Sequence, residues 1–261
     1  MPDRLKPHRD SNVKRITVNL KIIRKVYNRL SRDLSCLLPA YCVLCGDTGE
    51  GERDLCRCCA AALPRNARPC MQCGVSLATG EAAICGKCLR KPPAFDRVLS
   101  PLRYAPPVDN LIKLLKFQRR LAAARLLGQL LADHVEAAGS DADLLVPVPL
   151  HPQRLRERGF NQARELARPL SQRLGIAVGE AVSWRQRNTA SQSALPASAR
   201  ASNVRGAFRV KGPLPPRVAI VDDVMTTGHT VDALARALKR AGARQVEVWV
   251  AARASGTGTR P

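Results

Sequence analysis

The sequence predicts an α/β protein built on a parallel sheet and preceded by a small module that is held together by metal. Two observations carry this expectation. Between residues 144 and 251, short apolar runs alternate with longer amphipathic runs, a pattern typical of the strands and crossover helices of a parallel sheet. Between residues 36 and 93, four Cys-x-x-Cys pairs lie in a stretch that is broken by proline and glycine and is too short to build its own core.

Length and composition set the context. The 261 residues allow one medium domain plus a small module, and 45% apolar with 25% charged residues is ordinary for a globular chain. No apolar run approaches the roughly 18 residues that span a bilayer, and no hydrophobic leader is visible. We therefore expect no transmembrane segment and a cytoplasmic location, where thiols stay reduced and the ten cysteines need a role other than disulfides.

The charge is strongly positive. Lys and Arg number 43 against 21 Asp and Glu, a net charge of +22. Such an excess favours a polyanionic partner through counterion release, with single-stranded DNA one candidate. Aromatic residues make up only 3% of the chain, so composition shows no stacking platform for single strands. A solvated basic surface produced by arginine-rich composition is the alternative.

Four regions follow one another along the chain. Residues 1–35 form a basic extension, in which apolar residues at spacings of three and four predict a basic amphipathic helix from Ile16 to Leu30. Such a helix could lie on a membrane surface, on nucleic acid or on its own protein. Residues 36–93 form the cysteine-rich module, residues 94–252 the α/β domain, and residues 253–261 a disordered tail.

The α/β domain is expected to contain the following elements in order. The helical segments are 108–137, with a break near 118–120, then 161–174 and 230–241. The strands are 97–104, 144–148, an uncertain 176–182, 218–221 and 246–251. A long Ser- and Ala-rich loop, 189–203, separates the uncertain strand from the next one and is typical of a lid or a disordered segment.

The cysteines predict zinc. Two pairs separated by ten residues are followed by two pairs separated by eleven, and two turns that each present two thiolates supply the four ligands that Zn²⁺ prefers. The candidate ligands are Cys42, Cys45, Cys56, Cys59, Cys70, Cys73, Cys85 and Cys88. One or two structural zinc ions would replace the core that this region lacks.

Several alternatives stay open for this cysteine module. The pairs could combine sequentially or in a cross-braced order, and redox or iron–sulfur chemistry is the rival interpretation. Cys36 and Cys58 fall outside the pattern. A zinc module is most often a scaffold or a docking surface, so its presence does not define an activity.

The segment from Val218 to Thr230 carries the most specific chemistry. Four apolar residues predict a buried strand, at whose end stand the adjacent carboxylates Asp222 and Asp223. A turn at the start of a helix follows and offers free backbone N–H groups and hydroxyls to a phosphate. The turn residues are Thr226, Thr227, Gly228, His229 and Thr230. Two carboxylates beside a phosphate cradle need a sugar diol or Mg²⁺ as partner, so the expected ligand is a ribose that carries a phosphate.

Arginines cluster near two other parts of the predicted sheet. The segment from Val146 to Gln162 also ends a strand and turns sharply, with Arg154 and Arg158 beside the turn. Arg185 and Arg187 lie beside the long loop. Guanidinium groups suit pyrophosphate by charge and by their fork geometry, although each of them could instead belong to a solvated face.

Residues 218–230 resemble, position by position, the signature of type I phosphoribosyltransferases. Together with the cysteine ladder and Arg158-Gly-Phe-Asn-Gln162, they make residues 38–252 similar to the ComF family. The resemblance implies a double zinc ribbon in front of a type I phosphoribosyltransferase-like domain. It also implies that Asp222 and Asp223 hold the ribose hydroxyls of 5-phosphoribosyl 1-pyrophosphate, residues 226–230 its 5′-phosphate, and the loop from Leu150 through His151 to Arg154 the pyrophosphate with Mg²⁺.

Two classes of function remain. The family resemblance implies a role in natural transformation, in the company of other DNA-uptake proteins, and a phosphoribosyltransferase would act there on an unknown acceptor. Because no acceptor-base pocket is recognisable in the sequence, the alternative is a protein that handles single-stranded DNA without turnover. In that case the same fold and the zinc module would serve as binding surfaces.

Overall fold

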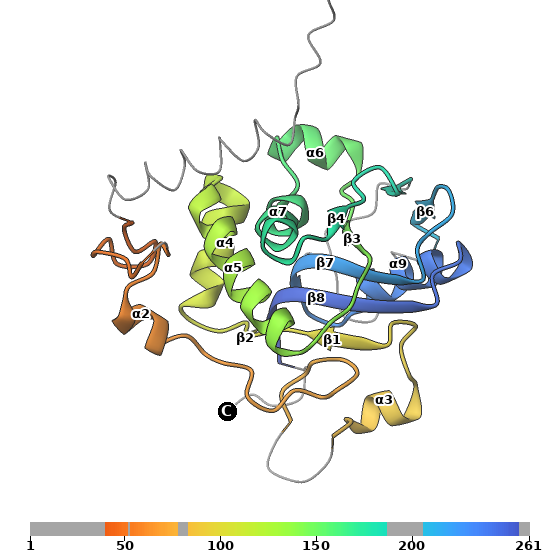
Figure 1. Cartoon of the computed structure of the whole chain (residues 1–261), viewed down its shortest axis with the longest axis horizontal. Helices are drawn as coiled ribbons and strands as arrows, with labels where there is room; N and C mark the ends of the chain where they lie inside the picture. The colour runs from red at the N-terminus through yellow and green to blue at the C-terminus, as the bar shows by residue number, and fades with distance from the viewer. Residues whose placement is uncertain (1–39, 52, 78–82, 187–205, 256–261) are drawn as a thin grey trace, which may run out of the picture.

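The computed structural model describes residues 40–51, 53–77, 83–186 and 206–255 (Figure 1). The predicted N-terminal helix, the loop predicted at 189–203, Arg187 and residues 256–261 lie outside the described residues. In the part of the chain that is described, no helix is both long and apolar enough to cross a membrane.

A parallel sheet forms the centre of the larger domain, as the α/β class predicts. Its strand order is β1-β8-β7-β3-β4, neighbouring strands run parallel, and β2 continues beside β8 in line with β1. The strands are β1 (Arg97–Leu99), β2 (Leu102–Arg103), β3 (Leu144–Pro147), β4 (Ala177–Val178), β7 (Arg217–Met225) and β8 (Gln245–Arg253). The two long strands β7 and β8 lie side by side, and β7 is enclosed between β8 and β3.

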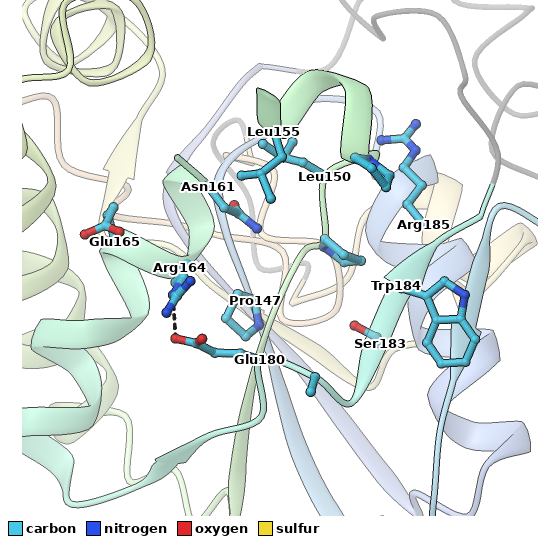
Figure 2. A pocket seen from close by; sticks show the side chains of 13 residues that line it. Pro147, Leu150, Leu155, Asn161, Arg164, Glu165, Glu180, Ser183, Trp184 and Arg185 are labelled. Carbon is cyan, nitrogen blue, oxygen red and sulfur yellow. Dashed lines mark ion pairs between the residues drawn. The ribbon is translucent and has the colours of Figure 1, made fainter. Parts of the chain in front are cut away.

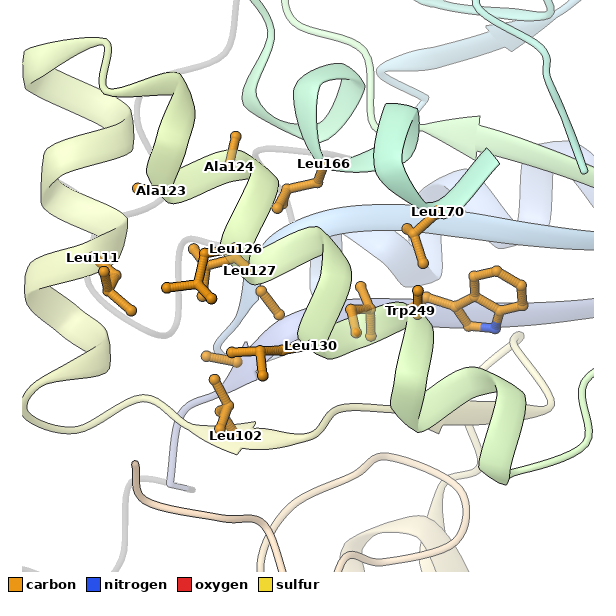
Figure 3. Close-up of a cluster of buried hydrophobic side chains, with 14 of the residues drawn as sticks. Leu102, Leu111, Ala123, Ala124, Leu126, Leu127, Leu130, Leu166, Leu170 and Trp249 are labelled. Carbon is orange, nitrogen blue, oxygen red and sulfur yellow. The ribbon is translucent and has the colours of Figure 1, made fainter. Parts of the chain in front are cut away.

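Helices cover both faces of this sheet. α4 (Val108–Gln118), α5 (Leu121–Ala137) and α7 (Gln162–Leu174) lie on one face, and α9 (His229–Arg240) lies on the other (Figure 1). Alternate residues of β7 therefore enter different cores: Val221 packs with the α5–α7 cluster and Ile220 with the α9 cluster. Figure 3 shows the first of these cores, with leucines of α5 and α7 around Trp249 of β8.

The predicted break between residues 118 and 120 is confirmed. Arg119 ends α4 in the left-handed conformation, with φ of 53°, and Arg120 is the N-cap of α5. The guanidinium of Arg119 lies against Gly159, 3.1 Å from the position that a Cβ would occupy there. The end of α4 is thereby held next to the end of the segment that follows β3.

Four element boundaries differ from the sequence expectations. The segment after β3 forms a helix, α6 (Pro152–Arg158), because Pro152 at its first turn and Gly159 at its C-cap, with φ of 78°, favour a short helix. Pro101 separates the predicted strand 97–104 into β1 and β2. The uncertain strand 176–182 shrinks to β4, and β7 continues four residues beyond Val221.

Two further strands were not expected. β5 (Ser183–Arg185) and β6 (Phe208–Val210) pair antiparallel outside the main sheet. β8 reaches Arg253, which the sequence places in the tail, and that residue is buried.

The cysteine-rich module packs directly on the α/β domain. It contains the short helices α2 (Arg57–Ala61) and α3 (Gly86–Arg90), each of which begins beside a Cys-x-x-Cys pair. Cys42 and Cys56 belong to the core on the α5 side, whereas Cys70, Cys73 and Cys88 belong to the core on the α9 side. The two halves of the module thus face different cores of the same domain.

Close packing of α5 on α7 generates a stability prediction. A Cβ at Gly128 would lie 2.3 Å from Cγ of Pro169 and 3.0 Å from the carbonyl oxygen of Leu166. Gly128→Ala should lower the free energy of unfolding by about 1–3 kcal/mol, although alanine is intrinsically the better helix former by about 1 kcal/mol. Urea denaturation measures the change, with Ala137→Gly at an exposed helical position as the propensity control. A gain in stability from Gly128→Ala would contradict the packing described.

Candidate functional site

The strand β7 carries both predicted carboxylates. Asp222 and Asp223 lie within the strand rather than beyond it, because the backbone ladder to β8 continues to Met225. Alternation along the strand directs the two side chains to opposite faces. Asp223 is only 5% exposed, on the face that α4 covers, while Asp222 is partly exposed. The two carboxylates are linked through the backbone, since the N–H of Asp223 donates to Oδ1 of Asp222 at 2.9 Å.

A lysine that the sequence analysis did not single out completes this pair. Nζ of Lys116, on α4, lies 2.6 Å from Oδ2 of Asp223. Although burial disfavours its charge, Asp223 and then Asp222 raise the pKa of Lys116. Burial, together with the charge on Asp223, raises the pKa of Asp222 to about 8. These surroundings therefore favour the charged form of Lys116 and the neutral form of Asp222.

The predicted phosphate turn follows directly. Gly228 is the N-cap of α9 with φ of 84°, a left-handed conformation that favours glycine. Oγ1 of Thr227 lies 3.2 Å from Nδ1 of His229. Thr226 is exposed at the end of the strand, and Thr230 lies in the first turn of α9, a helix of 12 residues. The free N–H groups of this helix start are available to an anion.

Two arginines reach the same region from α6. Leu150 and His151 form the loop that precedes this helix, and Nδ1 of His151 accepts from the backbone N–H of Gln153 at 3.3 Å. Arg158 lies within electrostatic range of Lys116, whose charged form it disfavours. Arg154 likewise lies within electrostatic range of Arg185 and disfavours the charged form of Arg185.

Arg185 of β5 lies within electrostatic range of Asp222. Burial lowers the pKa of Arg185, Arg154 adds to that effect, and Asp222 opposes it. Its guanidinium carbon lies 5.6 Å from the centre of the Phe208 ring. Basic groups of α4 and β5 thus lie near the carboxylate pair, and the arginines of α6 lie near those basic groups. Lys116 could not be found by local pattern, because α4 is far from β7 in the sequence.

A cavity of about 420 Å³ lies behind the loop that leads into α6 (Figure 2). Leu150 and Arg185 contribute to its walls, whereas neither carboxylate of β7 does. Arg164 of α7 and Glu180 form an ion pair of 2.5 Å at its side. The predicted site residues therefore divide between the end of β7 and this adjoining cavity.

The cysteines form two separate groups of four. Cys42, Cys45, Cys56 and Cys59 make one, and Cys70, Cys73, Cys85 and Cys88 make the other, with all sulfurs of a group within 4.8 Å of one another. Zn–S bonds of about 2.3 Å in a tetrahedron set the sulfur separation at about 3.8 Å. The separations are 3.6 Å between Cys45 and Cys56 and 3.7 Å between Cys73 and Cys85. Both groups fit structural zinc, and the sequential pairing is confirmed.

The thiols within a group differ in pKa. Although burial disfavours the Cys42 thiolate, backbone N–H groups lower the pKa of Cys42 to about 6. The pKa of Cys70 is lowered to about 7 in the same way. By contrast, hydrogen bonding with Cys56 and Cys45 raises the pKa of Cys59. Four thiolates this close repel one another unless a cation lies between them, which is the role that zinc would fill.

Adjacent cysteines test the zinc assignment. Cys59 belongs to the first group and Cys58, beside it in α2, is exposed and outside both groups. We expect two zinc ions per chain by plasma mass spectrometry, about one after Cys59→Ser, and two after Cys58→Ser. Equal zinc content in the two variants, or less than one zinc in the unmodified chain, would show that these sulfurs do not form the sites described.

Two family models match the chain. A model described as a double zinc ribbon domain matches residues 34–89, and a model described as a phosphoribosyl transferase domain matches residues 118–261. Among solved structures, purine phosphoribosyltransferase from Pyrococcus horikoshii Ot3 is 19% identical and covers 53% of this chain and 78% of its own, at a TM-score of 0.33. That score is too low to assign the fold, which is assigned from the order of the strands and from the two family models.

Curated relatives match most of the chain. The DNA utilization protein YhgH of Salmonella typhi is 39% identical over 220 residues, which are 81% of this chain and 96% of the relative. YhgH of Escherichia coli K12 is 40% identical over 219 residues with the same coverage. Competence protein F of Haemophilus influenzae is 34% identical over 223 residues, which are 82% and 96% of the two chains. The chain therefore belongs to the ComF family, in which a double zinc ribbon precedes a phosphoribosyl transferase domain.

Proposed function

We propose that the chain binds 5-phosphoribosyl 1-pyrophosphate together with Mg²⁺ at the end of β7, and that it serves DNA utilization or uptake. The observation that carries the proposal is the juxtaposition of the Asp222–Asp223 pair with the glycine turn at the start of α9. A phosphorylated ribose needs both parts at once, since its diol seeks carboxylates and its phosphate seeks N–H groups. A role in DNA utilization or uptake is supported by the similarity to proteins named DNA utilization protein YhgH and Competence protein F.

Each residue of the site has a role in this proposal. Asp222, the partly exposed acid, faces the ribose hydroxyls, and Asp223, on the α4 side of the strand, holds Lys116 beside the donor. Backbone N–H groups and hydroxyls of residues 226–230 hold the 5′-phosphate. Arg154 and Arg158 face the pyrophosphate. Residues 150–154 contain no carboxylate, so Mg²⁺ would be held largely by phosphate oxygens of the donor itself.

The reaction that such an arrangement supports is transfer of the phosphoribosyl group. The bond between C1 of the ribose and the pyrophosphate oxygen breaks, pyrophosphate leaves with the electron pair, and a nucleophilic atom of the acceptor forms the new bond to C1. Arg154, Arg158 and Lys116 stabilise the negative charge that develops on the leaving group. Release of pyrophosphate from labelled donor with some acceptor supports turnover, whereas binding without release across bases and nucleic acids supports a ligand-binding role.

Calorimetric titration tests the donor site. The double variant Asp222→Asn, Asp223→Asn should bind 5-phosphoribosyl 1-pyrophosphate with Mg²⁺ at least about 100-fold more weakly. Asp222→Asn removes the carboxyl that the ribose faces, and Asp223→Asn removes the anionic partner of Lys116, an ionic hydrogen bond worth about 1.5–3 kcal/mol. Asp109→Asn is the control, since Asp109 lies on α4 and pairs only with Lys113 across one helical turn in the contacts described. Zinc content should stay at the unmodified level in both. Undiminished donor binding by the double variant would refute the site.

A second candidate function, binding of single-stranded DNA, is favoured by one exposed aromatic residue. Phe117 is 74% exposed at the end of α4, directly after Lys116 and close to Arg119 and Arg120. An aromatic ring among cations is the arrangement on which bases of a single strand stack. The net charge of +22 supplies the electrostatic part of such binding.

Fluorescence anisotropy with a labelled oligonucleotide tests this candidate. Affinity should fall steeply with salt, and Phe117→Ala should weaken it about 5- to 150-fold, the equivalent of about 1–3 kcal/mol per stacked base. Tyr41→Ala is the matched control, because Tyr41 is a 61% exposed aromatic residue in the zinc module. A larger loss of affinity from Tyr41→Ala than from Phe117→Ala would show that the strand binds the zinc module instead. Binding that does not depend on salt would refute the candidate.

A further inference from the structure

Arg253, the last residue of β8, joins two sites that are distant in the sequence. Its side chain is buried at 6% exposure and is surrounded by backbone carbonyls. Nε donates to the carbonyl of Cys73 at 2.8 Å, in the second cysteine group. Nη1 lies 2.9 Å from the carbonyl oxygen of Met225 and 2.5 Å from that of Thr226, where the phosphate turn begins. One guanidinium thus touches both a cysteine of the second group and the start of residues 226–230.

The charge of Arg253 is balanced in an unusual way. No carboxylate forms an ion pair with it among the residues that the structure describes. Burial lowers its pKa, and the sulfurs of Cys73, Cys85 and Cys88 oppose that effect. A Zn²⁺ ion with four thiolates carries a net charge of about −2. The metal-loaded second group is therefore the counter-charge that a buried arginine needs.

Further contacts fix the second cysteine group to the same part of the domain. A Cβ at Gly74, in the turn after Cys73, would lie 2.8 Å from Cγ1 of Val98 on β1 and 3.9 Å from Cδ of Arg253. The backbone N–H of Ala94 donates to Oδ1 of Asp232 at 2.7 Å, in the first turn of α9. Both the end of β7 and the start of α9 are thus held from this side.

The first cysteine group is attached elsewhere. Arg125 of α5 donates to Oδ2 of Asp54 through Nε at 2.9 Å, and Arg53 pairs with Asp133 of α5 at 2.6 Å. These contacts lead to the α5–α7 face, away from the phosphate turn. The two groups have the same ligands but different connections, which provides an internal control.

We propose that Arg253 is a positioning residue that couples metal occupancy of the Cys70–Cys88 group to phosphate binding at residues 226–230, and that the Cys42–Cys59 group lacks this coupling. The proposal rests on the proposed function, since residues 226–230 must bind the phosphate of the donor. Coupling of this kind is reciprocal: if the metal improves the turn for phosphate, bound phosphate must retain the metal.

The experiment measures zinc release to a chromogenic chelator with and without saturating 5-phosphoribosyl 1-pyrophosphate and Mg²⁺. Alkylation followed by mass spectrometry assigns each release to one cysteine group. In the full unmodified chain, the ligand should slow release from the Cys70–Cys88 group about 10-fold or more and leave the other group unchanged. Ribose 5-phosphate, which lacks the pyrophosphate, should give the same selective protection.

Matched arginine variants complete the test. Arg253→Met should weaken binding of ribose 5-phosphate about 10- to 100-fold and abolish the selective protection of zinc, and Arg253→Lys should restore part of both. Arg125→Met, which removes one of the two ion pairs that attach the first group to α5, should leave ligand affinity and protection as in the unmodified chain. Should Arg253→Met fail to fold, the release rates of the unmodified chain still decide the question.

Two failures are distinguishable. If the unmodified chain binds neither compound, the proposed function is wrong and the coupling falls with it. If it binds them while zinc release from the Cys70–Cys88 group is unaffected, or is slowed equally in both groups, the donor site stands and the coupling is overturned.

Discussion

The ion pair between Lys116 and Asp223 is the interaction on which the site depends. Two adjacent carboxylates on a buried central strand would repel each other and lose hydration, and both effects disfavour their ionised forms. Lys116 pairs with Asp223 at 2.6 Å, and the raised pKa of Asp222 favours the neutral form of that acid. The strand can therefore carry both acids in the sheet without an excess of negative charge facing an anionic ligand.

This dependence extends to the helices. Lys116 reaches Asp223 only because α4 lies over the end of β7, and α4 ends at the left-handed Arg119, whose guanidinium rests on Gly159 at the end of α6. This contact brings the end of α4, which carries Lys116, next to the end of α6, which carries the arginines. Rigid elements rather than loops supply most of the basic groups around the carboxylates, an arrangement that preserves geometry.

Much of the fold was predictable because the signals were local. The strand–turn–helix at 218–230, the break near residue 119 and the cysteine pairs each depend on neighbouring residues. Lys116 was not predictable, because nothing in the pattern of an amphipathic helix marks which cation of its polar face will meet a strand far along the chain. Arg253 was assigned to a tail because the residues after it are small and polar, whereas its side chain is held by carbonyls of two segments that are distant in the sequence, at Cys73 and at 225–226. The helix α6 was missed because its sequence, with one proline and three arginines, gives a weak helical period.

The zinc ribbons are packed into the α/β domain and are not a separate module. Their cysteines enter both cores of the α/β domain, so the module borrows its hydrophobic surroundings from the sheet and its helices. This mutual support follows from size, since neither half of the module is long enough to bury a core alone. The two cysteine groups, the parallel sheet and the turn at residues 226–230 therefore belong to one packed unit.

A crystal structure of the chain soaked with 5-phosphoribosyl 1-pyrophosphate and Mg²⁺ examines the central claim most directly. The account predicts density for the 5′-phosphate at residues 226–230, ribose hydroxyls against Asp222, and Lys116 still paired with Asp223. Donor density in the cavity behind Leu150, or none at the end of β7 under saturating conditions, would contradict it.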